Sequence, residues 1–271
     1  MKQELLVNFL IKFSFYFVVI FGLCPVRYSI PKRRFERSFW LHLYSLCFII
    51  AFCYIYLTSG ITVLSVINPL FAAIFVYLTI STICIIFIAQ MWQCERVVHL
   101  LNSAQNILQT FKFIKTEVVN ICPYLMWFIF KTAIVNFAAQ FSIIFGLNHI
   151  LIQITGSGDY VSIVSLSVSY TVQTLLLNVF YTMLLVGSYL YNRLNGAIFQ
   201  ITKKAYETMS YPSDDSKYIK IQKYCNFADE LDEIMIFHRK ITVWILTLNK
   251  IWAIQLMAGM TNILVVCIVQ V

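Results

Sequence analysis

Charged side chains are scarce in this sequence. Asp, Glu, Lys and Arg make up 12% of the 271 residues, while 60% of the residues are hydrophobic. A soluble domain usually carries about 25% charged residues. Half that fraction, together with five apolar runs of about 20 residues each, argues against a soluble domain and indicates an integral membrane protein.

The residue patterns of common enzyme and metal sites are absent as well. The eight cysteines form no CxxC pair, so no zinc spacing or disulfide framework is visible. The four histidines are isolated, and no Walker loop, dinucleotide fingerprint, HExxH motif or Ser/His/Asp set occurs. We therefore expect no enzymatic activity, no catalytic residues, no metal and no cofactor.

The basic residues are distributed unevenly along the chain. The net charge is +8, but nearly all Lys and Arg fall in three separate connections, 25–38, 93–122 and 192–250. The connections 58–69 and 148–160 hold none. This pattern is typical of membrane orientation, in which basic loops are cytoplasmic, rather than of a nucleic-acid-binding face.

Five spans alternate across the membrane between these connections. The first apolar segment, 5–24, is interrupted by Asn8 and Lys12, and it could span the membrane or lie in its interface. Residues 1–38 form a cytoplasmic N-terminal region if 5–24 lies in the interface; if 5–24 spans, the N-terminus is outside and only the loop 25–38 is cytoplasmic. The sequence therefore predicts an all-α polytopic membrane protein, with spans over 39–57, 70–92, 123–147, 161–191 and 251–271.

The segment 192–250 is the one long polar stretch of the chain. The helical pattern before it continues toward Met209, so that helix exceeds the ~30 Å hydrocarbon thickness and should project from the membrane. A turn is predicted at 211–215, and Asn226 is the expected N-cap of a returning helix, with Asp229 completing an approximate capping box. This second helix runs into the last span and shows one apolar stripe, Leu231, Ile234, His238, Ile241, Ile245, Leu248 and Trp252.

Several motifs, in order along the chain, carry a family resemblance. They are Phe21-Gly22-Leu23-Cys24-Pro25, Tyr28, the basic run from Lys32 to Ser38, Tyr191-Asn192-Arg193-Leu194-Asn195, and Ala228 to Glu233 followed by His238. With these motifs the chain resembles the insect gustatory receptor family of the insect chemoreceptor superfamily.

The resemblance implies a helical bundle with seven spans, a cytoplasmic N-terminus, and helices that extend below the membrane into an anchor shared by four chains. It implies a ligand-gated cation channel of the plasma membrane that detects small-molecule tastants as a homo- or hetero-tetramer. We expect 192–250 to form the anchor. The family's pore motif, Thr-Tyr-(apolar)₅-Gln-Phe, does not occur here. We therefore expect the chain to cover the first five main helices and not to conduct alone.

Polar side chains inside the spans are the candidates for ligand binding. Interhelical hydrogen bonding is their simplest explanation. The alternative is a tastant pocket, mostly apolar and aromatic, with a few amides and hydroxyls that orient the ligand. Lys131 lies inside a span too, and could be functional or could extend its side chain to the interface. The predicted ligand-binding residues are Tyr77, Asn136, Gln140, Tyr170, Gln173 and Asn262.

Two other functions compete with the receptor channel. A G-protein-coupled receptor fragment would have six spans if 5–24 crosses the membrane. Against it, the outer connections lack Cys, and Trp92-Gln93-Cys94-Glu95-Arg96 contains no acidic-Arg-aromatic triplet. A transporter is the third possibility, but transporters often show related halves and Gly/Pro-broken spans. Here no repeat is visible, and only 8 Gly and 5 Pro occur.

Overall fold

The computed structural model describes residues 12–13, 15–67, 69–110, 120, 122–155, 160–210 and 217–269, and nearly all of them are helical. A short N-terminal helical segment occupies 12–13 and 15–20. The predicted all-α membrane fold is confirmed, with one small hairpin added. The elements are β1 (Val26–Ser29), β2 (Arg34–Arg37), α2 (Phe39–Ile67), α3 (Pro69–Trp92), α4 (Cys94–Thr110), α5 (Cys122–Ile129), the π-helical segment η1 (Phe130–Val135), α6 (Asn136–Thr155), α7 (Tyr160–Ser210) and α8 (Lys217–Val269).

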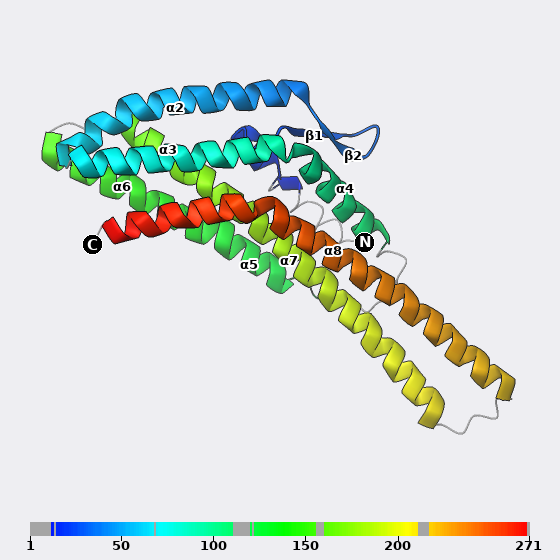
Figure 1. Ribbon diagram of the computed structural model, residues 1–271. Coiled ribbons are helices and arrows are strands. Elements are labelled where there is room, and N and C mark those ends of the chain that lie inside the picture. Colours follow the sequence, from blue (N-terminus) through cyan, green and yellow to red (C-terminus); the bar gives the residue numbers. More distant parts are fainter. Residues whose placement is uncertain are drawn as a thin grey trace.

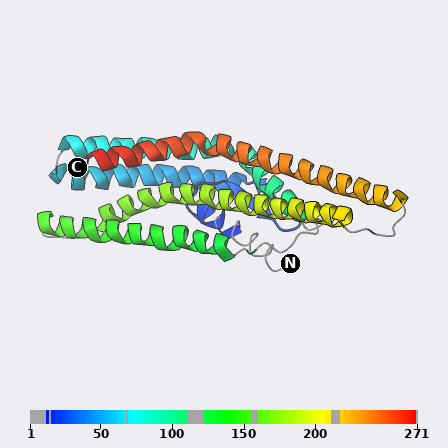
Figure 2. The same ribbon diagram turned by 90° about the horizontal axis from the view of Figure 1, so that it is seen from below.

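The helices form an elongated bundle with one projecting end. Helices α2, α3, α6 and the adjoining parts of α7 and α8 lie alongside one another, and the far parts of α7 and α8 extend beyond them as a pair (Figures 1 and 2). Helix α7 lies at the centre, because it packs against α2, α3, α5, α6 and α8. It therefore connects the bundle to the projecting end.

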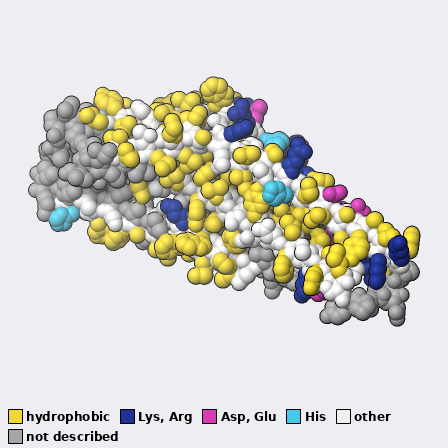
Figure 3. All heavy atoms as spheres, turned by 60° about the horizontal axis from the view of Figure 1, so that its bottom comes forward, with side chains coloured by type: hydrophobic (Ala, Val, Ile, Leu, Met, Phe, Trp, Pro, Cys, Tyr) yellow, Lys and Arg dark blue, Asp and Glu magenta, His cyan; other side chains and the backbone are white. Residues whose placement is uncertain are grey.

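Apolar side chains cover the outside of the bundle. Ile50, Tyr54 and Ile88 are each at least 60% exposed, a pattern that suits lipid rather than water. In the described part of the chain, three helices are long and apolar enough to cross a membrane, or four if α3 and α4, which meet at a 66° bend, form one span. On the face drawn in Figure 3, most charged side chains lie over the half that carries the hairpin and the projecting helices.

The two projecting helices were predicted, but the start of the second was not. Helices α7 and α8 have 51 and 53 residues, so each is roughly 75–80 Å long at 1.5 Å per residue. Asn226 lies inside α8, so the N-cap interpretation is wrong. The residues before it, from Lys217, are mostly acceptable helix formers, and the capping pattern did not decide where the helix begins. The predicted turn at 211–215 lies outside the described residues.

The predicted apolar stripe of α8 is largely buried. Ile234, Ile241, Leu248 and Trp252 are at most 4% exposed, whereas Leu231 is 41% exposed. Phe237 and Trp244, which the stripe omitted, are buried beside them. The packed face is therefore wider than a single row, as is usual where a helix contacts several others.

The predicted connections are mostly helical. Helix α2 continues to Ile67, because the uncharged stretch after Leu57 contains no breaker stronger than Gly60, and α3 begins at Pro69, a residue favoured at the first helical position. Helix α6 likewise runs to Thr155 within the expected loop 148–160. Helix α4 fills most of the expected connection 93–122. The expected turn at 58–69 and loop at 148–160 are therefore wrong for most of their residues, because an uncharged or polar composition does not by itself end a helix.

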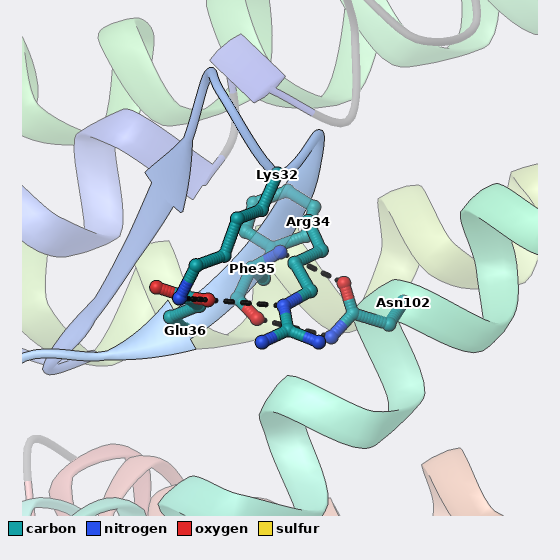
Figure 4. A network of polar contacts seen from close by, with 5 residues as sticks. All are labelled: Lys32, Arg34, Phe35, Glu36 and Asn102. Carbon is teal, nitrogen blue, oxygen red and sulfur yellow. Dashed lines mark hydrogen bonds and ion pairs between the residues drawn. The ribbon is translucent and has the colours of Figure 1, made fainter.

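A β-hairpin that the sequence did not predict precedes the first long helix. Strands β1 and β2 pair antiparallel, and Phe35 is 1% exposed. The Asn102 side chain of α4 holds this strand at both backbone groups: Phe35 N donates to Oδ1 (2.8 Å), and Nδ2 donates to Phe35 O (3.0 Å) (Figure 4). Hydrogen bonds from Lys32, which has the larger effect, and from Arg34 hold the pKa of Glu36 below its usual value.

Candidate ligand pocket

A cavity of ≈ 410 Å³ lies between the N-terminal helical segment, the α5–η1–α6 helix and α7. The α5–η1–α6 helix contributes a row of side chains spaced four residues apart, which places them on one face of that helix. Helix α7 faces them with residues spaced three or four apart. Phe13 and Phe17 complete the wall from the N-terminal segment. The rows are Phe128, Thr132, Asn136 and Gln140, and opposite them Thr171, Thr174, Leu175, Asn178 and Val179.

The π-helical segment lies within the first of these rows. Residues Phe130–Val135 take wider turns than an α-helix, so positions four apart stay closer to one line along the helix. Such segments often occur at functional sites. Here the segment keeps Thr132 and Asn136 on the wall that faces α7.

Gln140 connects the two rows by hydrogen bonds. Its Nε2 donates to Thr171 Oγ1 (2.6 Å), and Ser167 Oγ donates to its Oε1 (2.7 Å). Thr171 Oγ1 in turn donates to the Ser167 carbonyl (2.8 Å). Both ends of the Gln140 amide are therefore satisfied within the protein, and this residue fixes the spacing of α6 and α7 at one end of the cavity.

The Asn178 side chain, unlike that of Gln140, is not fully hydrogen-bonded. It is 8% exposed and lines the same cavity, yet Oδ1 has no hydrogen-bond partner among the described residues. A buried carbonyl oxygen without a donor is costly, and most such groups in proteins are paired. The oxygen itself is buried, so the Asn178 side chain must rotate toward the cavity before a hydroxyl or N–H group of a bound molecule can supply the missing donor.

Comparison with known families identifies the chain. A family model described as "7tm Chemosensory receptor" matches residues 11–271. The chain belongs to this chemosensory receptor family. The resemblance to insect gustatory receptors found in the sequence is thereby confirmed at the level of the insect gustatory and odorant receptor family. No curated protein and no solved structure matches the chain. The family consists of membrane receptors and is not an enzyme family.

The receptor brings together some of the predicted ligand-binding residues and separates others. Asn136, 9% exposed, and Gln140 both line the cavity. Gln173 and Asn262 instead pair with each other, with Asn262 Nδ2 donating to Gln173 Oε1 (3.2 Å) between α7 and α8. That contact is the interhelical hydrogen bond that was the simpler explanation for such residues.

The remaining predicted residues do not line this cavity. Tyr77 is 59% exposed on α3. Tyr170 is half-buried, and its carbonyl accepts a hydrogen bond from Thr174. Lys131 is half-buried in η1. The sequence reasoning did not select Thr171 and Asn178 for the site, although together with Thr174 their spacing marks one polar face of the apolar helix α7.

Proposed function

We propose that this receptor is a subunit of a ligand-gated cation channel that detects small-molecule tastants at the plasma membrane. In this proposal residues 25–38, 93–122 and 192–250 are cytoplasmic, and the projecting parts of α7 and α8 contribute to an anchor shared with other receptor chains as a homo- or hetero-tetramer. The family match supports the receptor role. The observation that carries the proposal is the cavity beside α7 and its unsatisfied Asn178.

The cavity indicates what kind of ligand it would hold. Small-molecule pockets are mostly apolar with a few polar groups that orient the ligand, and this cavity combines Phe13, Phe17 and Phe128 with amides and hydroxyls. None of the described residues that line it is charged. We therefore expect a small uncharged molecule with an apolar body and at least one hydroxyl or N–H group.

The position of the cavity supports a route for gating. Residues 171–179 of α7 line it, and the same unbroken helix continues to Ser210 in the projecting end. A ligand that binds one arrangement of α6 and α7 more tightly than another shifts the population toward that arrangement. Because α7 is continuous, such a shift would be transmitted along its length to the anchor.

Replacement of Asn178 by Leu tests the proposal. The receptor would be coexpressed with a member of the same family that conducts, and currents would be recorded against a panel of small uncharged tastants. Loss of a hydrogen bond to a buried acceptor costs about 1–2 kcal/mol, so we expect the half-maximal ligand concentration to rise roughly 5- to 30-fold.

The matched control is Asn195→Leu, the same change at an exposed position of α7. Surface expression and pull-down with the partner chain would establish that both variants fold. A normal ligand response from a well-expressed Asn178→Leu receptor would contradict the assignment of this cavity as the ligand site.

A further inference from the structure

A second cavity, with different chemistry, lies between α4 and α8. It is a groove of ≈ 520 Å³, and its lining includes three basic or titratable side chains, His99, Arg239 and Lys240. No Asp or Glu is among the described residues that line it. Arg239 and Lys240 are exposed, and neither forms an ion pair within the described part of the chain. The groove therefore presents positive charge that no carboxylate of the described residues neutralises.

The floor of the groove is apolar. Leu100 and Ile107 of α4 and Phe237 and Trp244 of α8 form it, and each is at most 7% exposed. Trp244 Nε1 donates to the Leu100 carbonyl (3.0 Å), so the indole is fixed in place. A free ion would gain nothing from this apolar floor, whereas an acyl chain could bind on it.

The rim adds hydrogen-bond donors to the positive charge. Ser103 and Asn106 of α4 line the groove, whereas Thr247 of α8 donates its hydroxyl to the Val243 carbonyl (2.8 Å). The Lys240 ammonium lies over the Phe237 ring at 5.3 Å from its centroid, which holds the charge at the edge of the apolar floor. Cationic, neutral polar and apolar groups thus follow one another along one groove.

The groove lies where the bundle meets the projecting helices. Helix α4 starts directly after the bend that follows Trp92, and Trp92 and Trp40 are 87% and 75% exposed, as expected of residues at a membrane interface. On α8 the groove extends from Thr247, just before the apolar stretch 251–269, to Ile236. At 1.5 Å per residue this is roughly 16 Å directed away from the membrane.

We propose that this groove binds an anionic phospholipid of the adjacent leaflet. One acyl chain lies on the floor near Leu100 and Trp244, and the phosphate lies farther from the membrane, between Arg239 and Lys240. This direction matches that of a lipid in the leaflet, with the headgroup outward from the hydrocarbon. The groove requires only the membrane setting and not ligand gating, so a negative lipid result leaves the proposed function standing.

Trp244 provides the probe for a test. The sequence has five Trp, and replacing Trp40, Trp92, Trp127 and Trp252 by Phe leaves the one in the groove floor. The full chain would be reconstituted in vesicles of phosphatidylcholine that contain chain-brominated phosphatidylglycerol or, separately, chain-brominated phosphatidylcholine at the same fraction. Because bromine quenches only nearby indoles, we expect stronger quenching of Trp244 by the anionic lipid.

The double variant Arg239→Gln/Lys240→Gln should weaken this preference. Each Lys or Arg near an anionic membrane contributes about a fivefold factor in binding, so we expect roughly 30-fold weaker association of the brominated anionic lipid. The control is Lys203→Gln/Lys204→Gln, which removes the same charge from an exposed adjacent pair on α7.

Three results would overturn the assignment. One is equal quenching by both lipids, and another is equal loss in the two double variants. The third is displacement of the brominated lipid by inorganic phosphate as effectively as by unbrominated phosphatidylglycerol, which would indicate an anion site without a lipid. Preferential displacement by unbrominated phosphatidylglycerol, with loss only in the groove variant, would support the lipid site.

Discussion

Single residues decide how closely α7 and α8 approach. A Cβ added at Gly187 would lie 3.0 Å from Ile245 Cδ1 and 3.6 Å from Trp244 Cζ3, so the absence of a side chain lets the two helices pack closely there. Gly196, nine residues farther along the same helix, has no atom of another described segment within 4 Å of the equivalent position. Gly187 therefore permits close packing of α7 on α8, whereas Gly196 lies at an open position of the same helix.

We expect opposite effects when these glycines are replaced. Gly187→Leu inserts atoms into a packed interface and should lower the free energy of unfolding by about 1–3 kcal/mol. Gly196→Ala should raise it by up to about 1 kcal/mol, because Ala has the higher helix propensity. Thermal unfolding in detergent would measure both. A destabilised Gly196→Ala variant would contradict the open position of Gly196, and an unaffected Gly187→Leu variant would contradict the close approach at Gly187.

At the scale of elements, the hairpin β1–β2 depends on α4. Its buried residue Phe35 packs on Phe15 and Tyr28, with ring centroids 5.0 and 5.1 Å apart, and Asn102 bonds its backbone on both sides. An isolated two-stranded hairpin is marginally stable at best. The hairpin is therefore stable here because a helix supplies the hydrogen bonds of a missing neighbouring strand.

Replacing Asn102 by Leu should loosen the hairpin. The change removes two hydrogen bonds and leaves a part-buried N–H and carbonyl of Phe35 unpaired, at a cost of about 1–3 kcal/mol per unsatisfied group. We expect the Phe35 amide to exchange with deuterium at least tenfold faster, while amides in the middle of α7 remain protected. Asn102→Asp serves as the graded control, because it keeps the acceptor for Phe35 N but replaces the donor to Phe35 O by a charged carboxylate oxygen. Unchanged exchange in Asn102→Leu would show that ring packing alone holds the strand.

At the scale of the whole molecule, the proposed sidedness can be tested with the cysteines. Cys225 is exposed on the projecting part of α8. Burial raises the pKa of Cys94 to about 11, and burial also raises the pKa of Cys24, so both thiols should react slowly near neutral pH, where the reactive thiolate is rare.

We expect a membrane-impermeant maleimide to label Cys225 only after the cell membrane is permeabilised. The measurement compares intact and permeabilised cells that express a variant with Cys225 as its only cysteine, and Cys225→Ser is the negative control. Labelling of intact cells at the same rate would place the projecting end outside and would overturn the proposed topology.

The sequence by itself determined the membrane class, the family and the two long projecting helices. Hydrophobicity and helical periodicity are local properties that add up along the chain, so α7 and much of α8 could be predicted from them.

Only the tertiary structure decided which residues share a cavity. Inside a membrane both the packed and the lipid-facing sides of a helix are apolar, so the sequence could not separate exposed Tyr77 from buried Asn136. The hairpin and the groove of α4 depend on contacts such as Asn102 with Phe35 and Trp244 with Leu100, which join residues 67 and 144 positions apart. No local pattern records contacts of that range, because they form only when distant segments pack against each other.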